Sequence, residues 1–347
     1  MTDILSLTLD EITDIMNSLN QPKYRAEQLF YALHLGKDLN NINVPSIVKD
    51  YLKQNYITEN ILQIIQQKVS QDGTTKFIYK LSDNNVIEGV LMQYKHGKTL
   101  CVSTQVGCRM GCKFCASGMD GLVRNLTAGE ILAQIIYVNK FLGGDVKSRQ
   151  ITNLVLMGSG EPLDNYDNTT KFLRLVNHPK GINISERNIS ISSCGLVDKI
   201  KQLADDGFEV NLCLSLHASN DTVRNQIMPI SLRYKIEDVI SACKYYFKKT
   251  GRRFIIEYTM IHGINDSLTH AKELVSLLKG LVCHINVINL NEVKEKPYKT
   301  CPKSDVYKFV DYLNSNGASA TTRRTMGDDI DGACGQLRRN FIKNNKV

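Results

Sequence analysis

Residues 108–115 read Cys108-Arg-Met-Gly-Cys112-Lys-Phe-Cys115 and set three cysteines in the spacing C-x3-C-x2-C. Thiolates are soft ligands, and closely spaced cysteines of this kind bind iron–sulfur clusters. A cubane cluster contains four irons, so three cysteines leave one iron without a protein ligand. An open iron has no use in a simple electron carrier. It is useful in an enzyme whose substrate or cofactor must bind the metal.

Two other kinds of site use neighbouring cysteines, a structural zinc site and a group of buried apolar thiols. Structural zinc normally takes four ligands, as two C-x2-C pairs or with histidines at set distances. No histidine lies within ten residues of the run on either side, and Cys101 is the only other nearby thiol. Buried thiols have no reason to cluster in this way. The spacing therefore favours an iron–sulfur cluster.

The length and composition of the chain limit the classes of protein to which it can belong. The chain has 347 residues, of which 42% are hydrophobic, enough for one large α/β domain with an appendage. It contains no run of 18 apolar residues, and its first 21 residues lack the pattern of a signal peptide, so we expect a cytoplasmic protein without a membrane partner. Ten cysteines in such a chain favour metal or redox chemistry. The net charge of +8 favours a polyanionic partner.

The first 93 residues differ in pattern from the rest. Three amphipathic helices are predicted there, followed by three strands joined by Asp-Gly and Asn-Asn turns, which indicates a small α+β domain. The helices are expected at Leu7–Leu19, Lys23–Leu35 and Val44–Asn55, and the strands at Ile64–Lys68, Lys76–Leu81 and Val86–Tyr94. Four basic residues of this domain suit phosphate contacts, although solvated helix faces explain most of them as simply: Lys23, Arg25, Lys37 and Lys49.

From about Leu100 short β-rich runs alternate with helical stretches, which predicts βα units and a parallel sheet in the form of a partial or full (β/α) barrel. We expect this core over residues 94–327 and a C-terminal segment over 328–347. Strands are expected at Leu100–Gln105, Asn153–Met157, Asn188–Ser192, Val210–Leu216, Phe254–Met260, His284–Ile288 and Ala318–Arg323. Helices are expected at Ala128–Leu142, Thr169–Val176, Val197–Asp205, Ile236–Lys249, Ser267–Leu278 and Lys303–Ser315.

In such barrels the reactive groups lie on loops at the carboxyl ends of the strands, where the cysteine run also falls. The turn Gly158-Ser159-Gly160-Glu161-Pro162 follows the second strand, and its glycines would let backbone amides approach a ligand. Later strands end in small or hydrogen-bonding residues: Ser192 and Ser193, Ser215-Leu216-His217, and Asn291. For any one of them, a polar residue that merely closes a strand is the simpler interpretation. Four strands that end in such residues, the glycine turn included, favour a ligand site.

A tenth cysteine, Cys334, lies near the C-terminus between small residues and close to three acids, Asp328, Asp329 and Asp331. It could be a buried structural thiol. Its small neighbours would also suit an accessible loop that carries the thiol into a cavity. Nearby carboxylates would raise the pKa of this thiol, so another group would have to activate it.

These motifs together resemble the RlmN/Cfr family of radical S-adenosylmethionine (SAM) RNA methyltransferases over nearly the whole chain. The spacing C-x3-C-x2-C, with an aromatic residue before the last cysteine, is the signature of the radical SAM superfamily. Further similarity lies in the stretches Gln21–Arg25, Ile87-Glu88, Leu100–Gln105, Arg124–Leu126, Gly160–Pro162, Ser215–Ala218 and Asp328–Leu337. Within the family, Gln105–Cys108 and Asp328–Leu337 are similar to the RlmN branch.

The resemblance implies a chemistry. Cys108, Cys112 and Cys115 would bind a 4Fe-4S cluster whose open iron holds SAM. One SAM would methylate Cys334, and a second would yield the 5′-deoxyadenosyl radical that activates this methyl group for addition to adenine. Glu88 would accept the ring proton, and Cys101 would attack Cys334 to release the product as a transient disulfide. SAM contacts would come from Gly160, Glu161, Ser192, Ser215, Leu216, His217 and Asn291.

The RlmN branch methylates carbon 2 of adenosine 2503 in 23S rRNA and, in some bacteria, adenosine 37 of certain tRNAs. The resemblance thus implies 23S rRNA, tRNA and a flavodoxin-type electron donor as partners. This carbon is electron-poor and has no lone pair with which to attack a sulfonium. A radical can add there, but the ring hydrogen must then leave as a proton, which requires a base. Exchange with a neighbouring thiol would free the sulfur-bound intermediate.

Two alternatives stay open. A Cfr-like enzyme would methylate carbon 8 of the same adenosine with the same catalytic residues, so the inventory of residues does not separate the two activities. A protein of another class, one that binds RNA or senses redox state with a structural cluster, would leave the Gly160–Pro162 turn and the pair Cys101 and Cys334 without a purpose.

Overall fold

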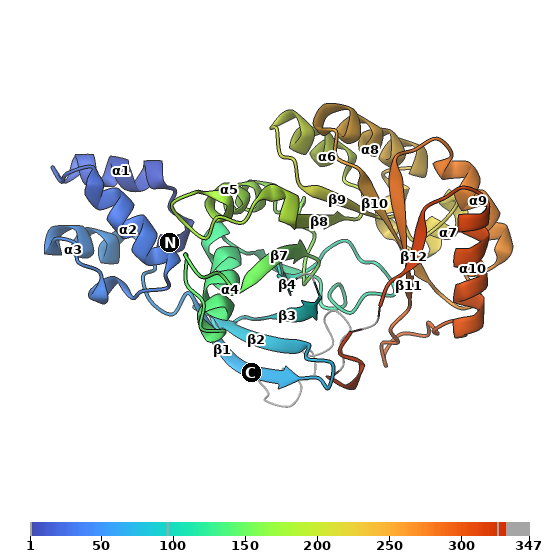
Figure 1. Cartoon of the computed structure of the whole chain (residues 1–347), viewed down its shortest axis with the longest axis horizontal. Coiled ribbons are helices and arrows are strands. Elements are labelled where there is room, and N and C mark those ends of the chain that lie inside the picture. The colour runs from blue at the N-terminus through green and yellow to red at the C-terminus, as the bar shows by residue number, and fades with distance from the viewer. Residues whose placement is uncertain (1, 96, 325, 331–347) are drawn as a thin grey trace. The chain divides into compact units, whose positions relative to one another are not determined.

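The computed structural model of the chain describes residues 2–95, 97–324 and 326–330, and its elements are labelled in Figure 1. The described residues form two compact units that are interleaved along the sequence. The first unit comprises the residues up to Val106 together with Arg124–Ser159 and Asn165–Ile189. The second unit comprises Gly107–Val123, Gly160–Asp164 and the described residues from Ser190 onward. The chain therefore passes from one unit to the other five times.

The first unit begins with three helices and a run of antiparallel strands. A capping box starts its first helix, because Thr8 accepts from the backbone of Glu11 while the Glu11 carboxylate accepts from the Thr8 N–H at 2.7 Å. The strands follow the order β1-β2-β3-β4-β7, antiparallel as far as β4 and parallel between β4 and β7. The elements are α1 (Leu9–Ser18), α2 (Tyr24–His34), α3 (Ser46–Asn55), β1 (Leu62–Val69), β2 (Thr75–Leu81), β3 (Val86–Tyr94), β4 (Gly97–Cys101), α4 (Ala128–Phe141), β7 (Ile151–Leu156) and α5 (Tyr166–Asn177).

The second unit is built from parallel strands in the order β8-β9-β10-β11-β12. Helices connect these strands, because two parallel neighbours cannot be joined by a tight turn, and Figure 1 shows the helices along the outside of the strands. The strand side chains that face the helices are fully buried, as at Leu212, Ile256 and Val287. The elements are β8 (Ile189–Ser193), α6 (Val197–Asp205), β9 (Asn211–Ser215), α7 (Asp221–Ile227), α8 (Ile236–Thr250), β10 (Phe254–Met260), α9 (Leu268–Leu278), β11 (Cys283–Asn289), α10 (Lys303–Ser315) and β12 (Ala320–Thr322).

A separate two-stranded sheet, β5 (Gln105–Gly107) with β6 (Leu122–Asn125), frames the cysteine run. Single 3-10 turns occur at Ile4–Ser6, Leu39–Asn41, Glu186–Asn188, Pro229–Leu232 and Asp328–Ile330.

The predicted parallel βα pattern is confirmed, and β3, β10, α6 and α10 have the predicted bounds. One predicted strand, Leu100–Gln105, was wrong in its extent, because β4 ends at Cys101. Beyond Cys101 the backbone N–H groups form hydrogen bonds outside the sheet. The Ser103 N–H donates to the Gln134 side chain at 2.9 Å, and the Thr104 N–H donates to the Ser159 carbonyl at 2.9 Å. The predicted N-terminal helices and antiparallel strands are present. Their predicted boundary near residue 93 falls at the end of β3, which pairs with β4 of the following segment.

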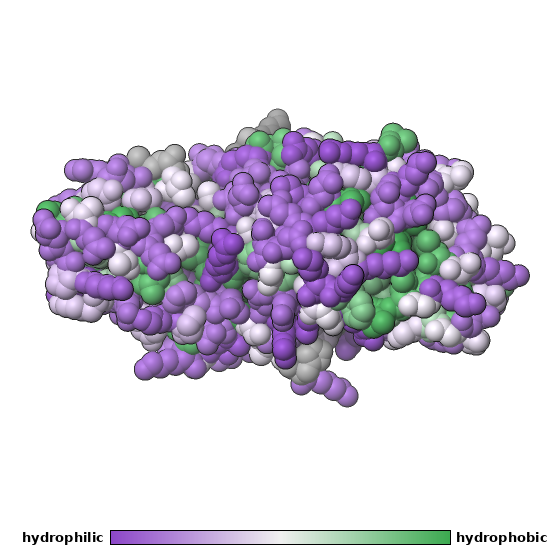
Figure 2. Space-filling view, turned by 90° about the horizontal axis from the view of Figure 1, so that it is seen from above, coloured by the Kyte–Doolittle hydropathy of each residue, from purple (hydrophilic) through white to green (hydrophobic). Residues whose placement is uncertain are grey.

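Among the described residues, no helix combines the length and the apolar composition needed to cross a bilayer. The face seen in Figure 2 is mostly hydrophilic, with its apolar residues in separate small groups.

Candidate active site

The cysteine run forms a loop of the second unit between β5 and β6. The Cys108 N–H donates to the Gly121 carbonyl at 3.0 Å, which closes the base of the loop. Gly107 makes this closure possible, because its φ is +78° and a Cβ atom there would lie 2.0 Å from the Gly121 carbonyl oxygen. The Lys113 N–H donates to the Ile227 carbonyl at 2.9 Å and holds the middle of the loop. Only glycine therefore fits at residue 107.

All three thiols of the loop are partly buried. Burial raises the pKa of Cys108 to about 12, and the Glu161 carboxylate adds to the effect. Burial also raises the pKa of Cys112, helped by the neighbouring thiols of Cys115 and Cys108. Such thiols stay protonated at neutral pH unless a metal ion displaces the protons. The loop is thus suited to holding a metal rather than to acting as a free nucleophile.

The distances between the three sulfur atoms distinguish a site for an iron–sulfur cluster from a site for a single zinc ion. Zinc–sulfur bonds are about 2.3 Å long, so two sulfurs on one zinc lie at most about 4.6 Å apart. Within the described part of the chain, the loop sulfurs do not form a group whose donor atoms all lie within 4.8 Å of one another. One zinc ion cannot bind all three sulfurs in this arrangement. A multi-iron cluster can, because each sulfur binds a different iron.

Glu161 of the predicted glycine turn is a buried carboxylate that fixes the start of the next loop. Its two oxygens accept from the backbone N–H groups of Cys194, at 2.8 Å, and Leu163, at 3.1 Å. Burial raises the pKa of Glu161 above its ordinary value, while these hydrogen bonds oppose the rise. Gly160, just before it, has a φ of +114°, a backbone conformation that favours glycine.

The ends of β8 and β9 are joined at Ser192 and Ser215, whose hydroxyl oxygens lie 3.1 Å apart. The residue that organises this edge is Arg224 on α7, which was not predicted from the sequence. Its guanidinium is fully buried and donates to the carbonyls of Cys194 at 2.7 Å and Leu216 at 3.2 Å. No motif marks this arginine, and only its burial distinguishes it from the solvated basic residues of other helices.

His217 takes an unusual backbone conformation, with a φ of +55°. Its Nδ1 accepts from the Thr259 N–H at 3.0 Å, and its ring packs edge-on against Phe114 of the cysteine loop at 5.1 Å between centroids. Burial, with the nearby positive charge of Arg224, lowers the pKa of His217 to about 3. The imidazole is therefore neutral, and because Nδ1 accepts, Nε2 carries the proton. Asn291, in contrast, is exposed beyond the end of β11.

A second group that was not predicted from the sequence joins β10, β11 and the residue just after β12. Glu257 on β10 is buried, accepts from the Asn286 side chain at 3.0 Å, and lies 3.7 Å from the guanidinium of Arg323. Burial raises the pKa of Glu257, and Arg323 opposes the rise. Because these residues are far apart in the sequence, no local pattern reveals the group.

Two predicted catalytic residues lie in the first unit, on neighbouring strands. Cys101 on β4 pairs with Val90 on β3, and Glu88 lies two residues before Val90, so both side chains emerge from the same face. Glu88 is buried, and its carboxylate lies 3.9 Å from the Nζ of Lys76. The third predicted catalytic residue, Cys334, lies outside the described residues.

Comparisons with known proteins identify the family and the fold of the chain. Residues 102–275 match the model of the radical SAM superfamily. The chain is 47% identical to the probable dual-specificity RNA methyltransferase RlmN of Clostridium novyi, over 99% of this chain and 100% of that protein. It is 46% identical to the RlmN of Lachnospira eligens, over 99% and 97%. The crystal structure of a radical SAM methyltransferase from Sphaerobacter thermophilus superposes with a TM-score of 0.90 at 39% identity, over 97% of this chain and 99% of that one. The predicted α/β fold of radical SAM type is confirmed.

Proposed function

Because the chain belongs to the RlmN family of radical SAM RNA methyltransferases, we propose that it methylates carbon 2 of adenosine 2503 in 23S rRNA and adenosine 37 in tRNA. One observation carries the proposal: a C-x3-C-x2-C loop in a chain that is 47% identical over its full length to an RlmN enzyme. Methylation of carbon 8, the Cfr-like alternative, is not favoured, because the similar proteins are RlmN enzymes.

The family implies an iron–sulfur cluster and SAM, and the described residues suit both. Cys108, Cys112 and Cys115 are the ligands that we assign to the 4Fe-4S cluster. When cluster and SAM are bound, together they supply the 5′-deoxyadenosyl radical, and we assign a second SAM per turnover to ordinary methyl transfer. The residues that we assign to SAM are Gly160, Glu161, Ser192, Ser215, Leu216, His217 and Asn291.

The framework around these residues supports the assignment. Arg224 fixes the carbonyls of Cys194 and Leu216, while Glu161 fixes the N–H of Cys194. Hydrogen bonds of this kind hold the ends of β8 and β9 in one geometry before any ligand binds, which lowers the cost of binding. The neutral ring of His217 packs on the loop residue Phe114 and so ties this edge to the cysteine loop.

The remaining steps fall to three residues. We assign to Cys334 the role of methyl carrier, to Glu88 that of acceptor of the ring proton, and to Cys101 the attack on Cys334 that releases the product. Support for the last two comes from β3 and β4, where Glu88 and Cys101 emerge from one face and Glu88 is shielded from water. In the release step the Cys101 thiolate would attack the Cys334 sulfur, so that a sulfur–sulfur bond forms as the sulfur–carbon bond breaks. The carbon would leave with the electron pair of the broken bond and take a proton to become the methyl group, and an external thiol would then reduce the transient disulfide.

We also propose that residues 1–93 bind RNA, that 94–327 form the catalytic core, and that 328–347 carry Cys334. Lys23, just before α2, and Lys37, just after it, are exposed and suit phosphate contacts. Arg25 and Lys49 already donate to the backbone carbonyls of Asn43 and Asn40. A flavodoxin-type protein is the electron donor that we propose, and because the proposed substrates are ribosomal and transfer RNAs, we propose a cytoplasmic location.

The site of methylation is tested by mass spectrometry of rRNA and tRNA from bacteria that lack their own RlmN enzyme and express this chain. The proposal requires 2-methyladenosine at position 2503 of 23S rRNA, and a Cys112→Ala variant should abolish it. Appearance of 8-methyladenosine instead would establish the Cfr-like alternative. A methylated rRNA with unmodified tRNA would restrict the enzyme to one substrate.

A further inference from the structure

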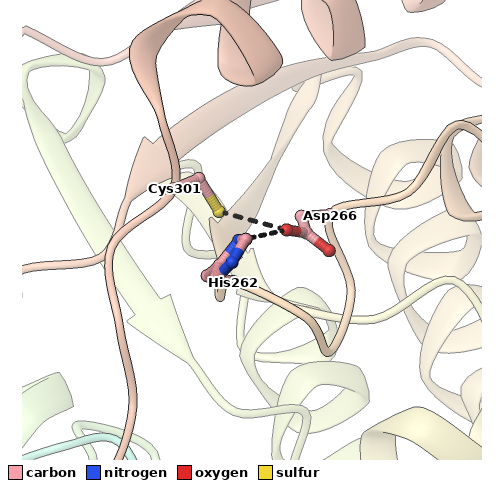
Figure 3. A group of neighbouring side chains, drawn as sticks. All are labelled: His262, Asp266 and Cys301. Atoms are coloured by element: carbon pink, nitrogen blue, oxygen red, sulfur yellow. Dashed lines mark hydrogen bonds and ion pairs between the residues drawn. The ribbon is translucent and has the colours of Figure 1, made fainter.

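Three donor side chains that the proposed function does not use converge in the second unit. His262 and Asp266 lie in the loop between β10 and α9, and Cys301 lies just before α10. Figure 3 shows their side chains pointing toward one another. Within the described part of the chain, they are the one group of three histidine, cysteine or acidic residues whose donor atoms all lie within 4.8 Å of one another.

The distances fit one tetrahedral ion. With bonds of about 2.0–2.1 Å to nitrogen and oxygen and about 2.3 Å to sulfur, tetrahedral zinc places a nitrogen and an oxygen donor about 3.4 Å apart. The same geometry places an oxygen and a sulfur donor about 3.6 Å apart. Here the Nδ1 of His262 lies 3.1 Å from the Oδ2 of Asp266, and the Sγ of Cys301 lies 3.7 Å from the same oxygen. Small side-chain movements are enough to reach the ideal values.

The backbone holds all three donors in place without a metal. The Asn289 side chain accepts from the Cys301 N–H and donates to the Cys301 carbonyl, each at 2.9 Å. The His262 N–H donates to the Lys299 carbonyl at 3.0 Å, which links the two loops directly. The Gly263 N–H donates to the Oδ2 of Asp266 at 3.0 Å and orients the carboxylate. In a preformed site of this kind, little free energy is lost in ordering the ligands when an ion binds.

The chemistry of the donors selects the class of metal. A thiolate and an imidazole are poor ligands for Ca²⁺ or Mg²⁺, which take oxygen, and they suit zinc and its transition-metal neighbours. Burial and the Asp266 carboxylate raise the pKa of Cys301 to about 12, so the thiol is not reactive by itself, and a divalent cation would deprotonate it. One thiolate and one carboxylate would then balance the charge of the cation. His262 is exposed and opens the site to solvent.

We propose that His262, Asp266 and Cys301 bind one Zn²⁺ ion, with water as the fourth ligand. The ion would fasten the segment between β11 and α10 to the loop that follows β10. This segment carries Asn291, three lysines and two glutamates, and Lys299 pairs with Glu292 at 3.1 Å, so the ion would fix the position of the loop that carries Asn291. The site shares no residue with the cysteine loop, and it does not depend on the proposed methyltransferase activity.

The test measures zinc and iron in the same protein by elemental mass spectrometry. The full-length, anaerobically reconstituted protein is incubated with a slight molar excess of ZnCl₂ and desalted. Wild-type protein should retain about one zinc per chain, the stoichiometry of a single site, in addition to its iron. The His262→Ala and Cys301→Ser variants should lose at least about 90% of the zinc and keep the iron, because zinc affinity falls steeply with each missing ligand. Cys283→Ser, at a half-buried cysteine of β11, is the matched control and should keep both metals.

The exposed His262 can be replaced without disturbing the core, and circular dichroism checks that each variant is folded. Zinc X-ray absorption provides a second readout. It should show one sulfur at about 2.3 Å and nitrogen or oxygen ligands at about 2.0–2.2 Å. Several sulfurs around the zinc would place it in the cysteine loop and overturn the proposal. Wild-type protein that retains no zinc, or variants that retain as much as wild type, would overturn it equally.

Discussion

The Nζ of Lys76 lies 3.9 Å from the Oε2 of Glu88, and the two side chains are 0% and 4% exposed. Removing one charge of a buried pair takes away the counter-charge of the other, which destabilises a protein by roughly 3–5 kcal/mol. We therefore expect Lys76→Met to lower the melting temperature strongly. The double variant Lys76→Met/Glu88→Gln should recover most of this loss.

The same pair separates the structural role of Glu88 from its proposed role as a base. Glu88→Gln is nearly isosteric but accepts no proton, so RNA methylation should fall by at least about 100-fold, the usual contribution of a general base. The double variant should be equally inactive although it is stable. SAM cleavage, measured as 5′-deoxyadenosine under reduction, should persist in both. Normal methylation by the stable double variant would remove Glu88 from the mechanism.

Gly107→Ala should prevent the cysteine loop from closing, because the new methyl group would lie 2.0 Å from the Gly121 carbonyl oxygen. Gly143 provides the matched control, since its φ of +74° is similar and no atom lies within 4 Å of its Cβ position. Both variants carry the backbone strain of an alanine at positive φ, roughly 1–2 kcal/mol. Only Gly107→Ala should lose iron, as determined after reconstitution. Equal iron contents would show that the loop tolerates a different closure.

The Cys101→Ala and Cys334→Ala variants should be blocked at different steps of the reaction. Without Cys334 no methyl carrier exists, so neither methylated protein nor methylated RNA should form. Without Cys101 the sulfur–carbon bond to the adenine cannot be cut by thiol exchange, and a covalent protein–RNA adduct should accumulate. Mass spectrometry after nuclease digestion detects the adduct. Free methylated RNA at the normal rate from Cys101→Ala would assign the release step to another thiol.

Arg224→Lys should weaken SAM binding although it preserves the charge. The three donors of a lysine lie on one terminal nitrogen, so they cannot replace the bonds that the separate Nε and Nη2 atoms of Arg224 make to the carbonyls of Leu216 and Cys194, and the ends of β8 and β9 would lose their common partner. We expect the SAM dissociation constant, measured by equilibrium dialysis, to rise about tenfold, which corresponds to about 1.4 kcal/mol. Arg233→Lys is the control, because that side chain is 72% exposed. A similar change in both variants would refute the framework role of Arg224.

His34 should make the protein sensitive to mild acid. Burial lowers its pKa to about 3, and its Nδ1 accepts from the Ile182 N–H at 3.2 Å. Below about pH 6.5 the unfolded chain binds a proton that the folded chain does not, so stability is lost as pH falls through this value. Between about pH 7.5 and 5.5 this group alone should remove about 1.4 kcal/mol. Urea unfolding at both pH values should show a smaller loss in His34→Gln; parallel losses in the two proteins would contradict this origin.

Local signals in the sequence predicted most of the elements. The capping pair Thr127 and Glu130 marks the start of α4, and its side chains bond as such pairs do. The cysteine spacing and the glycine turn with Glu161 identified two loops of the candidate site. Both motifs are only a few residues long, so they can be recognised without knowledge of the tertiary fold.

Other features depend on contacts between distant parts of the chain. The buried Arg224 donates to four backbone carbonyls from separate parts of the chain, and Cys301 meets His262 only because β10 and β11 are neighbours. The early end of β4 depends on Gln134, more than thirty residues away. No window of sequence contains such information.

The interleaving of the two units has a consequence for how this protein can change during evolution. Each unit is assembled from three separate stretches of the gene, and the cysteine loop and the Gly160–Asp164 turn are insertions of one unit into the sequence of the other. A single crossover in recombination cannot transfer either unit intact to another gene. Descendants of such a chain should diversify by substitution and by growth at their ends, rather than by exchange of whole units.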